Sequence, residues 1–320
     1  MKKDFLFKNL IEVLQDRIPQ RGRLAEELTE LLGIEKEAVY RRLRGSVPFS
    51  FQEIYKISTN LGFSLDSIAA STTPENKQVS VLMLELPDLQ ENDYKKIEEF
   101  TDNIGRLKED KDSESGAIGS IIPASFSAAY ENIFKFYIFK RSYQFANSWK
   151  RRAYAETNTP ERIKQINREL VENVRNSPKS VYIFDRQFIE YFVKDVLFFF
   201  DIRMISRDDV LLLKGDLHLL INDLERFSTN GCFDSGSKVE IYLANIHFDA
   251  NYNYIDATSY KLTTMRSFAF TDSYSFDEAV FQNMKNWLTF LKRTSTLISE
   301  GNASERIRFF ETQRKIVDSL

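Results

Sequence analysis

Apolar residues in the first seventy positions recur at the spacing of three and four residues that is typical of short amphipathic helices. The first two groups are Phe5, Leu6, Leu10, Ile11 and Leu14, then Leu24, Leu28, Leu31 and Leu32. Gly33 follows the second group directly, and glycine adopts the left-handed turn that ends many helices at little cost. The pattern predicts two helices, the second ending in a tight glycine turn that Ile34 fills.

A third helix is predicted over about Lys36 to Leu43, with Val39 and Leu43 on its inner face. Its outward positions are Lys36, Glu37, Tyr40, Arg41 and Arg44, and Gly45 ends it. Two more short helices follow, one with Ile54, Ile57 and Leu61 and one with Leu65 and Ile68. Two helices joined by a tight glycine turn have helix-turn-helix geometry.

The next part of the chain reads as a connection. Residues 71–79 are polar and contain proline, which predicts a linker, and residues 79–86 read as a short strand. Residues 88–107 are helical, with Ile97, Phe100, Ile104 and Leu107 in a heptad-like pattern. Two heptads are too few for an autonomous coiled coil, which leaves packing against the body of the protein or a dimer seam.

Beyond a polar loop at 108–116, the pattern predicts mostly helices and one small sheet. A long aromatic helix is expected from Phe126 to Trp149, and others near 160–174, 186–202 and 208–227. Residues 239–248, 251–260 and 261–271 then alternate with period two and predict an antiparallel meander. A capping box at Ser275 and Glu278 and a final helix at 304–317 complete a mainly α (α+β) chain.

Composition agrees with a folded, mostly helical protein of about two domains. Of 320 residues, 42% are hydrophobic and 28% charged, and the 11 Gly and 7 Pro are few for a protein rich in turns. One cysteine, Cys232, excludes an intramolecular disulfide and a multi-thiolate metal site, and two histidines are too few for most histidine-built sites. We therefore expect no metal or cofactor. No secretory signal or apolar run of membrane-spanning length occurs, which predicts a cytoplasmic protein without membrane contact.

Charge is more informative by position than in sum. The net charge is −3, yet Arg41, Arg42 and Arg44 fall within one turn of the third predicted helix. Residues 1–70 carry 11 basic and 10 acidic side chains, so their net charge is +1. The net charge argues against a protein whose whole surface is basic and binds nucleic acid. A local basic cluster of this kind nevertheless favours a nucleic-acid contact at the third helix.

The line LTELLGIEKEAVYRRLRG, followed by SFQEIYKISTNLGFSLDSI, resembles the lambda-repressor-like (XRE-type) helix-turn-helix domain. The Gly33-Ile34 turn, Val39 and Gly45 match that pattern. Two positions depart from it: Glu35 replaces the usual Ser or Thr helix cap, and Arg42 replaces an apolar residue. Leu43 can take over the packing of that apolar residue. The resemblance implies a DNA-binding domain over residues 1–72, with its third helix in the major groove of an operator.

The resemblance also implies the roles of individual residues. Lys36, Glu37, Tyr40 and Arg41 match positions that meet base edges, and Arg41 can pair with guanine O6 and N7. Phosphate contacts are expected from Arg42, Arg44, Ser50 and Gln52. The alternative is a solvated charged helix on a protein-interaction scaffold that keeps the fold without binding DNA.

The segments IIPASFSAAYENIFKFYIFKRS and KRTSTLISEGNASERIRFFETQRKI resemble the C-terminal part of a family of bacterial helix-turn-helix regulators. This resemblance implies a transcriptional regulator with a large accessory domain. We expect residues 73–112 to form a linker, a short strand and a connecting helix, and residues 113–320 to form a domain that dimerises, senses a small ligand, or both. A homodimer is expected because one small helix-turn-helix domain buries little surface on DNA. No phosphate loop, GxSxG or HExxH motif occurs, so no enzymatic activity is expected.

The many aromatic residues, 27 Phe and 14 Tyr, indicate either a core or a cavity for a small-molecule effector. If a cavity exists, we expect its walls to come from the long aromatic helix and the tyrosine-rich sheet. The residues predicted to line it are Phe134, Tyr137, Tyr143, Tyr242 and Tyr254.

Overall fold

A computed structural model describes residues 5–18, 20–63, 82–83, 91–145, 152–258, 261–266 and 272–320. The chain forms two compact units, an N-terminal unit of Met1–Ser80 and a C-terminal unit of Val81–Leu320. The expected linker at 71–79 and the expected helix around Leu65 and Ile68 lie outside the described residues. The helix at 91–106 belongs to the C-terminal unit.

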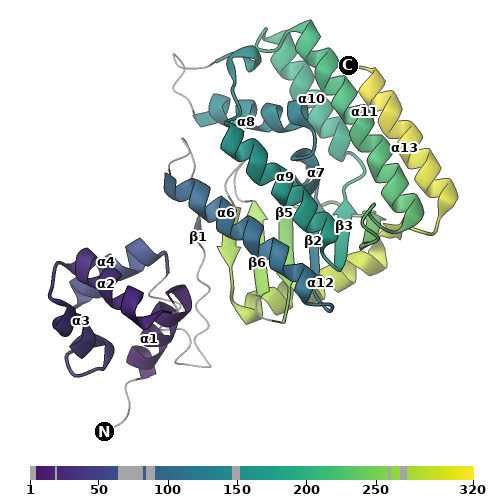
Figure 1. Ribbon diagram of the computed structural model, residues 1–320. Helices are drawn as coiled ribbons and strands as arrows, with labels where there is room; N and C mark the ends of the chain where they lie inside the picture. The colour runs from purple at the N-terminus through teal and green to yellow at the C-terminus, as the bar shows by residue number, and fades with distance from the viewer. Residues whose placement is uncertain are drawn as a thin grey trace. The chain divides into compact units, whose positions relative to one another are not determined.

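The N-terminal unit is a bundle of short helices (Figure 1). Its described helices are α1 (Phe5–Arg17), α2 (Arg21–Leu32), α3 (Lys36–Leu43) and α4 (Phe51–Leu61). Their inner faces meet in one core, with Leu14, Leu24, Leu28, Val39 and Ile57 almost fully buried. The same positions carry the helical periodicity of the sequence, because burying that apolar face is what stabilises such short helices.

The C-terminal unit is built on an eight-stranded mixed sheet in the order β1-β7-β6-β5-β2-β3-β4-β8. Its strands are β1 (Leu82–Met83), β2 (Glu114–Gly119), β3 (Lys179–Phe184), β4 (Lys238–Leu243), β5 (Asn251–Asp256), β6 (Lys261–Arg266), β7 (Asp272–Ser275) and β8 (Thr296–Leu297). The central strands β2, β3 and β4 are parallel, and the other pairings are antiparallel. β3 is buried along nearly its whole length, as expected for a parallel strand covered on both faces.

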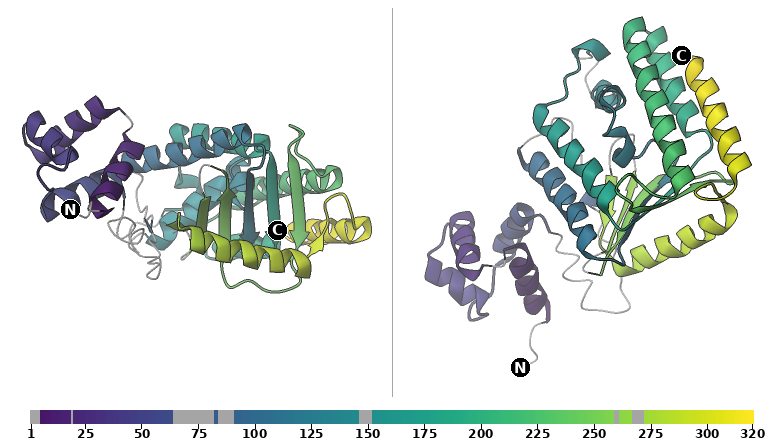
Figure 2. Two further views of the ribbon diagram at one scale, coloured as in Figure 1. Left: turned by 90° about the horizontal axis from the view of Figure 1, so that it is seen from below. Right: turned by 45° about the vertical axis from the view of Figure 1, so that its right-hand side comes forward.

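Helices cover both faces of this sheet unequally (Figure 2). One face packs against α12 (Glu278–Thr294) through Phe281, Met284, Leu288 and Leu291. The other face carries the remaining helices, which are α6 (Glu91–Arg106), α7 (Ala124–Ser127), α8 (Glu131–Phe145), α9 (Glu161–Asn176), α10 (Phe188–Asp201), α11 (Arg207–Asn230) and α13 (Ala303–Asp318). Short 3-10 turns occupy Leu107–Glu109 and Tyr154–Glu156.

The mainly α (α+β) class is confirmed, but the sheet is larger and more mixed than expected. β4 does not join β5 in a meander; it pairs in parallel with β3, while β5, β6 and β7 form the antiparallel run. The strands β2 and β3 were not predicted. β2 has the sequence ESGAIG, which is poor in strand-forming residues, and it is a strand because both its edges are paired.

The structure corrects two local expectations and favours one of the two alternatives left open for a third. The long aromatic helix is divided into α7 and α8, with residues 146–151 outside the described part. The cap of α12 is Asp277, whose carboxylate accepts from the N–H groups of Ala279 and Val280, whereas Ser275 lies in β7. The apolar stripe of α6 lies against α9, with Ile104 and Leu107 in a buried cluster, which favours packing over a dimer seam.

Candidate nucleic-acid interface and C-terminal cavity

The turn between α2 and α3 has the geometry of a helix-turn-helix. Gly33 ends α2 in the left-handed region, with φ +66°, and its N–H donates to the carbonyl of Thr29 at 3.0 Å. α3 then runs with Val39 fully buried and Leu43 packed against the same core. This arrangement turns the side of α3 opposite to Val39 toward solvent.

The predicted base-contacting residues lie together on the outward surface of α3. Lys36, Glu37 and Arg41 are exposed and Tyr40 is half-buried. Lys36 pairs with Glu26 of α2 at 2.8 Å, and Arg44 pairs with Glu37 at 2.9 Å. Such exposed pairs are worth little, about 0–1 kcal/mol, so a phosphate can displace them. Among the basic residues of α3 and its cap, Arg41 alone has no ion pair with any described residue.

Arg42 has a different environment from the other basic residues. Its side chain is 19% exposed and forms an ion pair of 3.0 Å with Glu53 of α4, itself 17% exposed. The Arg42 guanidinium also donates to the carbonyl of Ala38. These contacts favour a role in joining α3 to α4 over the phosphate contact expected for Arg42, and they explain how an arginine occupies an apolar position of the pattern.

Glu53 also caps α4, at the edge where phosphates were predicted to bind. Its carboxylate accepts from the backbone N–H of Ser50 at 2.7 Å, and the Ser50 hydroxyl accepts from the Glu53 N–H, which forms a capping box. Burial alone would raise the pKa of Glu53, but the Ser50 N–H and Arg42 outweigh burial and lower it. Gln52 lies exposed beside this box. Arg42 thus offsets a negative charge that would otherwise repel a phosphate at α4.

Replacement of Glu53 tests this joint between α3 and α4. Glu53→Ala removes the reciprocal cap and leaves Arg42 half-buried without its partner, so it is expected to destabilise the N-terminal unit by about 1–2 kcal/mol. Unfolding followed by far-UV circular dichroism measures this loss of stability. Both tryptophans, Trp149 and Trp287, belong to the C-terminal unit. An unchanged unfolding transition in tryptophan fluorescence therefore shows that the destabilisation is confined to the N-terminal unit. The matched control, Glu12→Gln in the exposed Lys8–Glu12 pair, is expected to change neither transition; equal losses in both variants would contradict the assignment.

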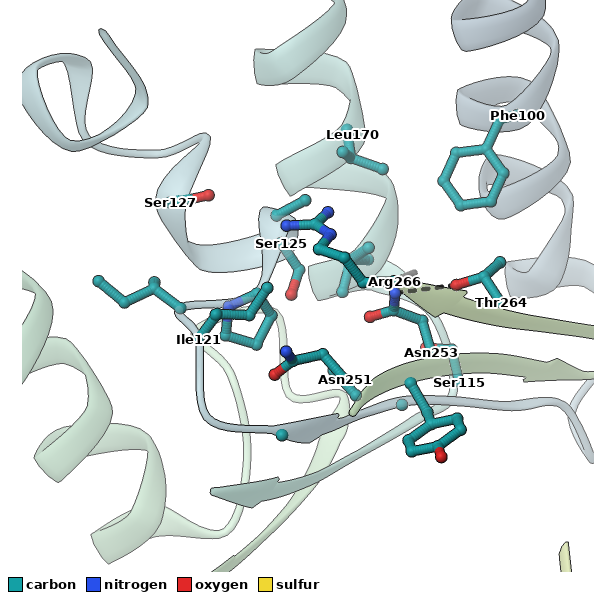
Figure 3. A pocket seen from close by; sticks show the side chains of 18 of the residues that line it. Phe100, Ser115, Ile121, Ser125, Ser127, Leu170, Asn251, Asn253, Thr264 and Arg266 are labelled. Atoms are coloured by element: carbon teal, nitrogen blue, oxygen red, sulfur yellow. Dashed lines mark hydrogen bonds between the residues drawn. The ribbon is translucent and has the colours of Figure 1, made fainter. Parts of the chain in front are cut away.

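The C-terminal unit contains a cavity of about 350 Å³ between the sheet and the helices α6, α7, α8 and α9 (Figure 3). Most of its wall is apolar, from Ile97, Phe100, Ile104, Ile163, Leu170 and Val174. The polar part comes largely from neighbouring strands, where Asn251 is opposite Arg266 and Asn253 is opposite Thr264. Arg141 and Asn167 add polar groups from α8 and α9.

The structure separates the five residues that were predicted to line one pocket. Phe134 and Tyr137 of α8 line the cavity. Tyr143 instead packs against Phe139 and Phe199, and it is not part of the cavity wall. Tyr242 lies with α12 on the opposite face of the sheet. Tyr254, like Phe134 and Tyr137, borders the cavity. The expectation is therefore corrected for Tyr143 and Tyr242, because aromatic content alone does not show on which face of a sheet or helix a residue lies.

Strand alternation explains which β5 residues reach the cavity. Tyr252 and Tyr254 belong to the cluster with α12, although both also border the cavity, and the Tyr254 ring packs over Gly116. Asn251, Asn253 and Ile255 alternate with them and lie on the cavity side. Asn251, Asn253 and Arg266 were missed as site residues. The period-two pattern of β5 could have indicated that the asparagines share a face, but it does not show that helices leave a space there.

Comparison with known protein families gives a match that covers the N-terminal part of the chain. Residues 3–88 match the family model of the BetR domain, which is a helix-turn-helix-type DNA-binding domain. No curated protein and no solved structure matches the chain. Within the described residues, no helix combines the length and apolar character needed to cross a membrane. The match supports a DNA-binding regulatory role for the N-terminal unit.

Proposed function

We propose that the protein is a cytoplasmic, sequence-specific transcriptional regulator, with an XRE-like N-terminal unit that binds an operator and a C-terminal unit that dimerises and senses a small molecule. The observation that carries the proposal is the outward face of α3, where Arg41 is exposed, lies next to Tyr40 and forms no ion pair with a described residue. Lys36 and Arg44 hold only exposed partners, which DNA phosphates can replace. Neither unit is assigned a catalytic activity.

The second candidate is a scaffold that uses the same fold for protein contacts. Phe51 and Tyr55, one turn apart on α4, are 77% and 59% exposed and would suit such a partner. A protein-binding surface does not, however, explain the basic residues of α3. The charge distribution therefore favours DNA.

A titration distinguishes these functions. The full chain is titrated by fluorescence anisotropy against labelled genomic fragments at several salt concentrations, with a random-sequence duplex as competitor. A regulator binds one fragment far more tightly than the competitor, and the logarithm of its binding constant falls linearly with the logarithm of salt concentration because condensed counterions are released. Equal, weak affinity for all fragments would favour the scaffold.

Self-association is expected through the C-terminal unit, because one small helix-turn-helix domain buries too little surface for tight specific binding alone. α11 offers a face for a second copy. Leu212 and Leu219, seven residues apart, are 54% and 58% exposed. Leu211 directly precedes Leu212, and the exposed Gly215 lies between Leu212 and Leu219 in the sequence. An apolar face with a glycine allows two copies of the helix to approach closely in an isologous contact.

Leu212→Glu combined with Leu219→Glu is expected to convert a dimer into a monomer at micromolar concentration in sedimentation velocity. The matched control, Phe290→Glu, alters an equally exposed apolar residue, 50% exposed on α12. It is expected to leave the dimer intact. A dimer that survives the double change would exclude the α11 face, and a monomeric unaltered chain would contradict dimerisation through the C-terminal unit.

A further inference from the structure

The polar groups that line the C-terminal cavity are almost all uncharged. Among the described lining residues there is no aspartate, glutamate, lysine or histidine, and the two arginines, Arg141 and Arg266, each already interact with another group. The other polar side chains are amides and hydroxyls. Because a charged group that leaves water costs free energy unless it gains a partner, a wall of this composition favours an uncharged ligand.

Two of the amides stand next to each other on β5. Asn251 and Asn253 belong to the same face of the strand, and Figure 3 shows both side chains projecting into the cavity. Residues two apart on a strand are separated by roughly 7 Å. A single amide group with a hydrogen bond at each end can span that distance, since each bond is about 2.9 Å long.

Each of these two amides has one polar group left for a ligand. The Oδ1 of Asn251 accepts from the backbone N–H of Ser120 at 2.7 Å, so its Nδ2 is the group without a bond to a described residue. A Cβ on Gly119 would lie 2.1 Å from that Oδ1, so the glycine provides the room in which the Asn251 side chain sits. The Nδ2 of Asn253 donates to the Thr264 hydroxyl at 3.0 Å, which leaves its Oδ1 as an acceptor. The pair therefore offers a donor from Asn251 and an acceptor from Asn253.

The remainder of the cavity suits an apolar body. Phe100 of α6, Phe134 and Ile138 of α8 and Leu170 of α9 contribute apolar surface on the side of the helices. The volume of about 350 Å³ is at the lower end of the range for small-molecule sites, which is roughly 300–1,000 Å³. The space therefore suits a small ligand with one polar end.

We propose that the cavity binds an uncharged amide, a carboxamide group attached to an aromatic or aliphatic body. Its carbonyl oxygen accepts from Nδ2 of Asn251, and its N–H donates to Oδ1 of Asn253. A carboxylate of the same shape lacks the N–H and brings a negative charge against the Asn253 oxygen. That this ligand is the effector rests on the proposed function; its binding does not.

Isothermal titration calorimetry of the full chain without DNA tests the proposal. The probes are 4-phenylbutanamide and octanamide, each compared with its carboxylate and with the methyl ketone of the same shape, 5-phenylpentan-2-one or nonan-2-one. One amide molecule is expected to bind per chain at least about tenfold more tightly than the carboxylate, because the ionised acid loses its hydration in the cavity. It is expected to bind about fivefold more tightly than the ketone, which keeps the carbonyl but has no N–H for Asn253.

Asn251→Asp tests the role of the donor. It keeps the oxygen that accepts from Ser120 but replaces Nδ2 with a second oxygen, so it is expected to weaken amide binding at least about tenfold. Asn283→Asp is the matched control, because Asn283 is exposed on α12, which covers the opposite face of the sheet, and the change alters net charge equally. Its affinities are expected to equal those of the unaltered chain.

Three results would overturn the proposal. They are carboxylates or ketones that bind as tightly as the amides, no binding by either amide, and a folded Asn251→Asp chain with unchanged affinity for the amides. Thermal unfolding identifies any variant that fails to fold, in which case the comparison of the probes on the unaltered chain decides alone. Because DNA is absent, each result is independent of operator binding.

Discussion

Arg41→Ala is expected to weaken operator binding by about 1–3 kcal/mol and to relax the preference at one base pair in each half-site. The reason is that Arg41 is exposed on α3 and forms no ion pair with any residue that the structure describes, so its guanidinium is available for a bidentate contact with a guanine. Loss of such a contact leaves one base unread. Anisotropy titrations with duplexes substituted one base pair at a time measure both effects.

Arg44→Ala is the matched comparison, since Arg44 lies just beyond α3 and pairs with Glu37. We expect it to contact phosphate and therefore to weaken all sequences alike and reduce the slope of log K against log salt by about one. The Arg41 change is expected to alter the ranking of duplexes instead. If both substitutions cause the same loss on every duplex, Arg41 does not read a base.

Glu114→Gln is expected to lower the free energy of unfolding of the C-terminal unit by about 3 kcal/mol at pH 7. Glu114 begins β2 and is 13% exposed, among basic groups from several elements. Its carboxylate pairs with Lys179 at 2.8 Å, lies near Lys285 and Lys292, and accepts from the Tyr254 hydroxyl at 2.7 Å. Burial would raise the pKa of Glu114, but these partners lower it from 4.5 to about 2.

The direction of the pH dependence follows from that lowered pKa. An acid whose pKa is lower in the folded state stabilises the fold at pH values above its unfolded pKa, and this stabilisation is lost as pH falls through the folded value. The unaltered chain should therefore lose this contribution between pH 4.5 and about 2. The Glu114→Gln chain lacks the contribution throughout, so the two stabilities should converge toward pH 2.

Urea unfolding followed by tryptophan fluorescence measures this effect, because Trp287 of α12 packs against Tyr252 of the same sheet. Glu161→Gln provides the control, since Glu161 is 82% exposed and pairs with Lys164 at the surface of α9. It should leave the unfolding curve unchanged. A constant difference between the Glu114→Gln and unaltered chains from pH 7 down to pH 2 would show that the lowered pKa of Glu114 does not contribute to stability.

The N-terminal unit could be predicted closely from the sequence because its interactions are local. Apolar spacing placed Val39 inward, and Gly33 marked the turn, both of which depend on residues a few positions apart. Arg42 was less predictable. Its partner Glu53 belongs to the next helix, and only the packing of α3 on α4 brings the two charges together.

The sheet and the cavity depended on contacts between distant segments. β2 has little strand propensity, and its partner strands β3 and β5 lie far along the chain. Once β5 is placed, strand alternation explains why its asparagines face the cavity, while Tyr254 packs in the cluster with α12 and also borders the cavity. Aromatic composition predicted a cavity wall on α8 but could not predict Arg266, because only the pairing of β5 with β6 puts it opposite Asn251.

Selection of bound duplexes from a random-sequence pool by the full chain tests the central claim, sequence-specific DNA binding through α3, most directly. The account predicts enrichment of a two-fold symmetric site with half-sites about one helical turn, roughly 10 base pairs, apart. Selection with the Arg41→Ala chain should yield the same symmetry with one position per half-site degenerate. Failure of the unaltered chain to enrich any sequence, or an identical motif from the Arg41→Ala chain, would contradict the account.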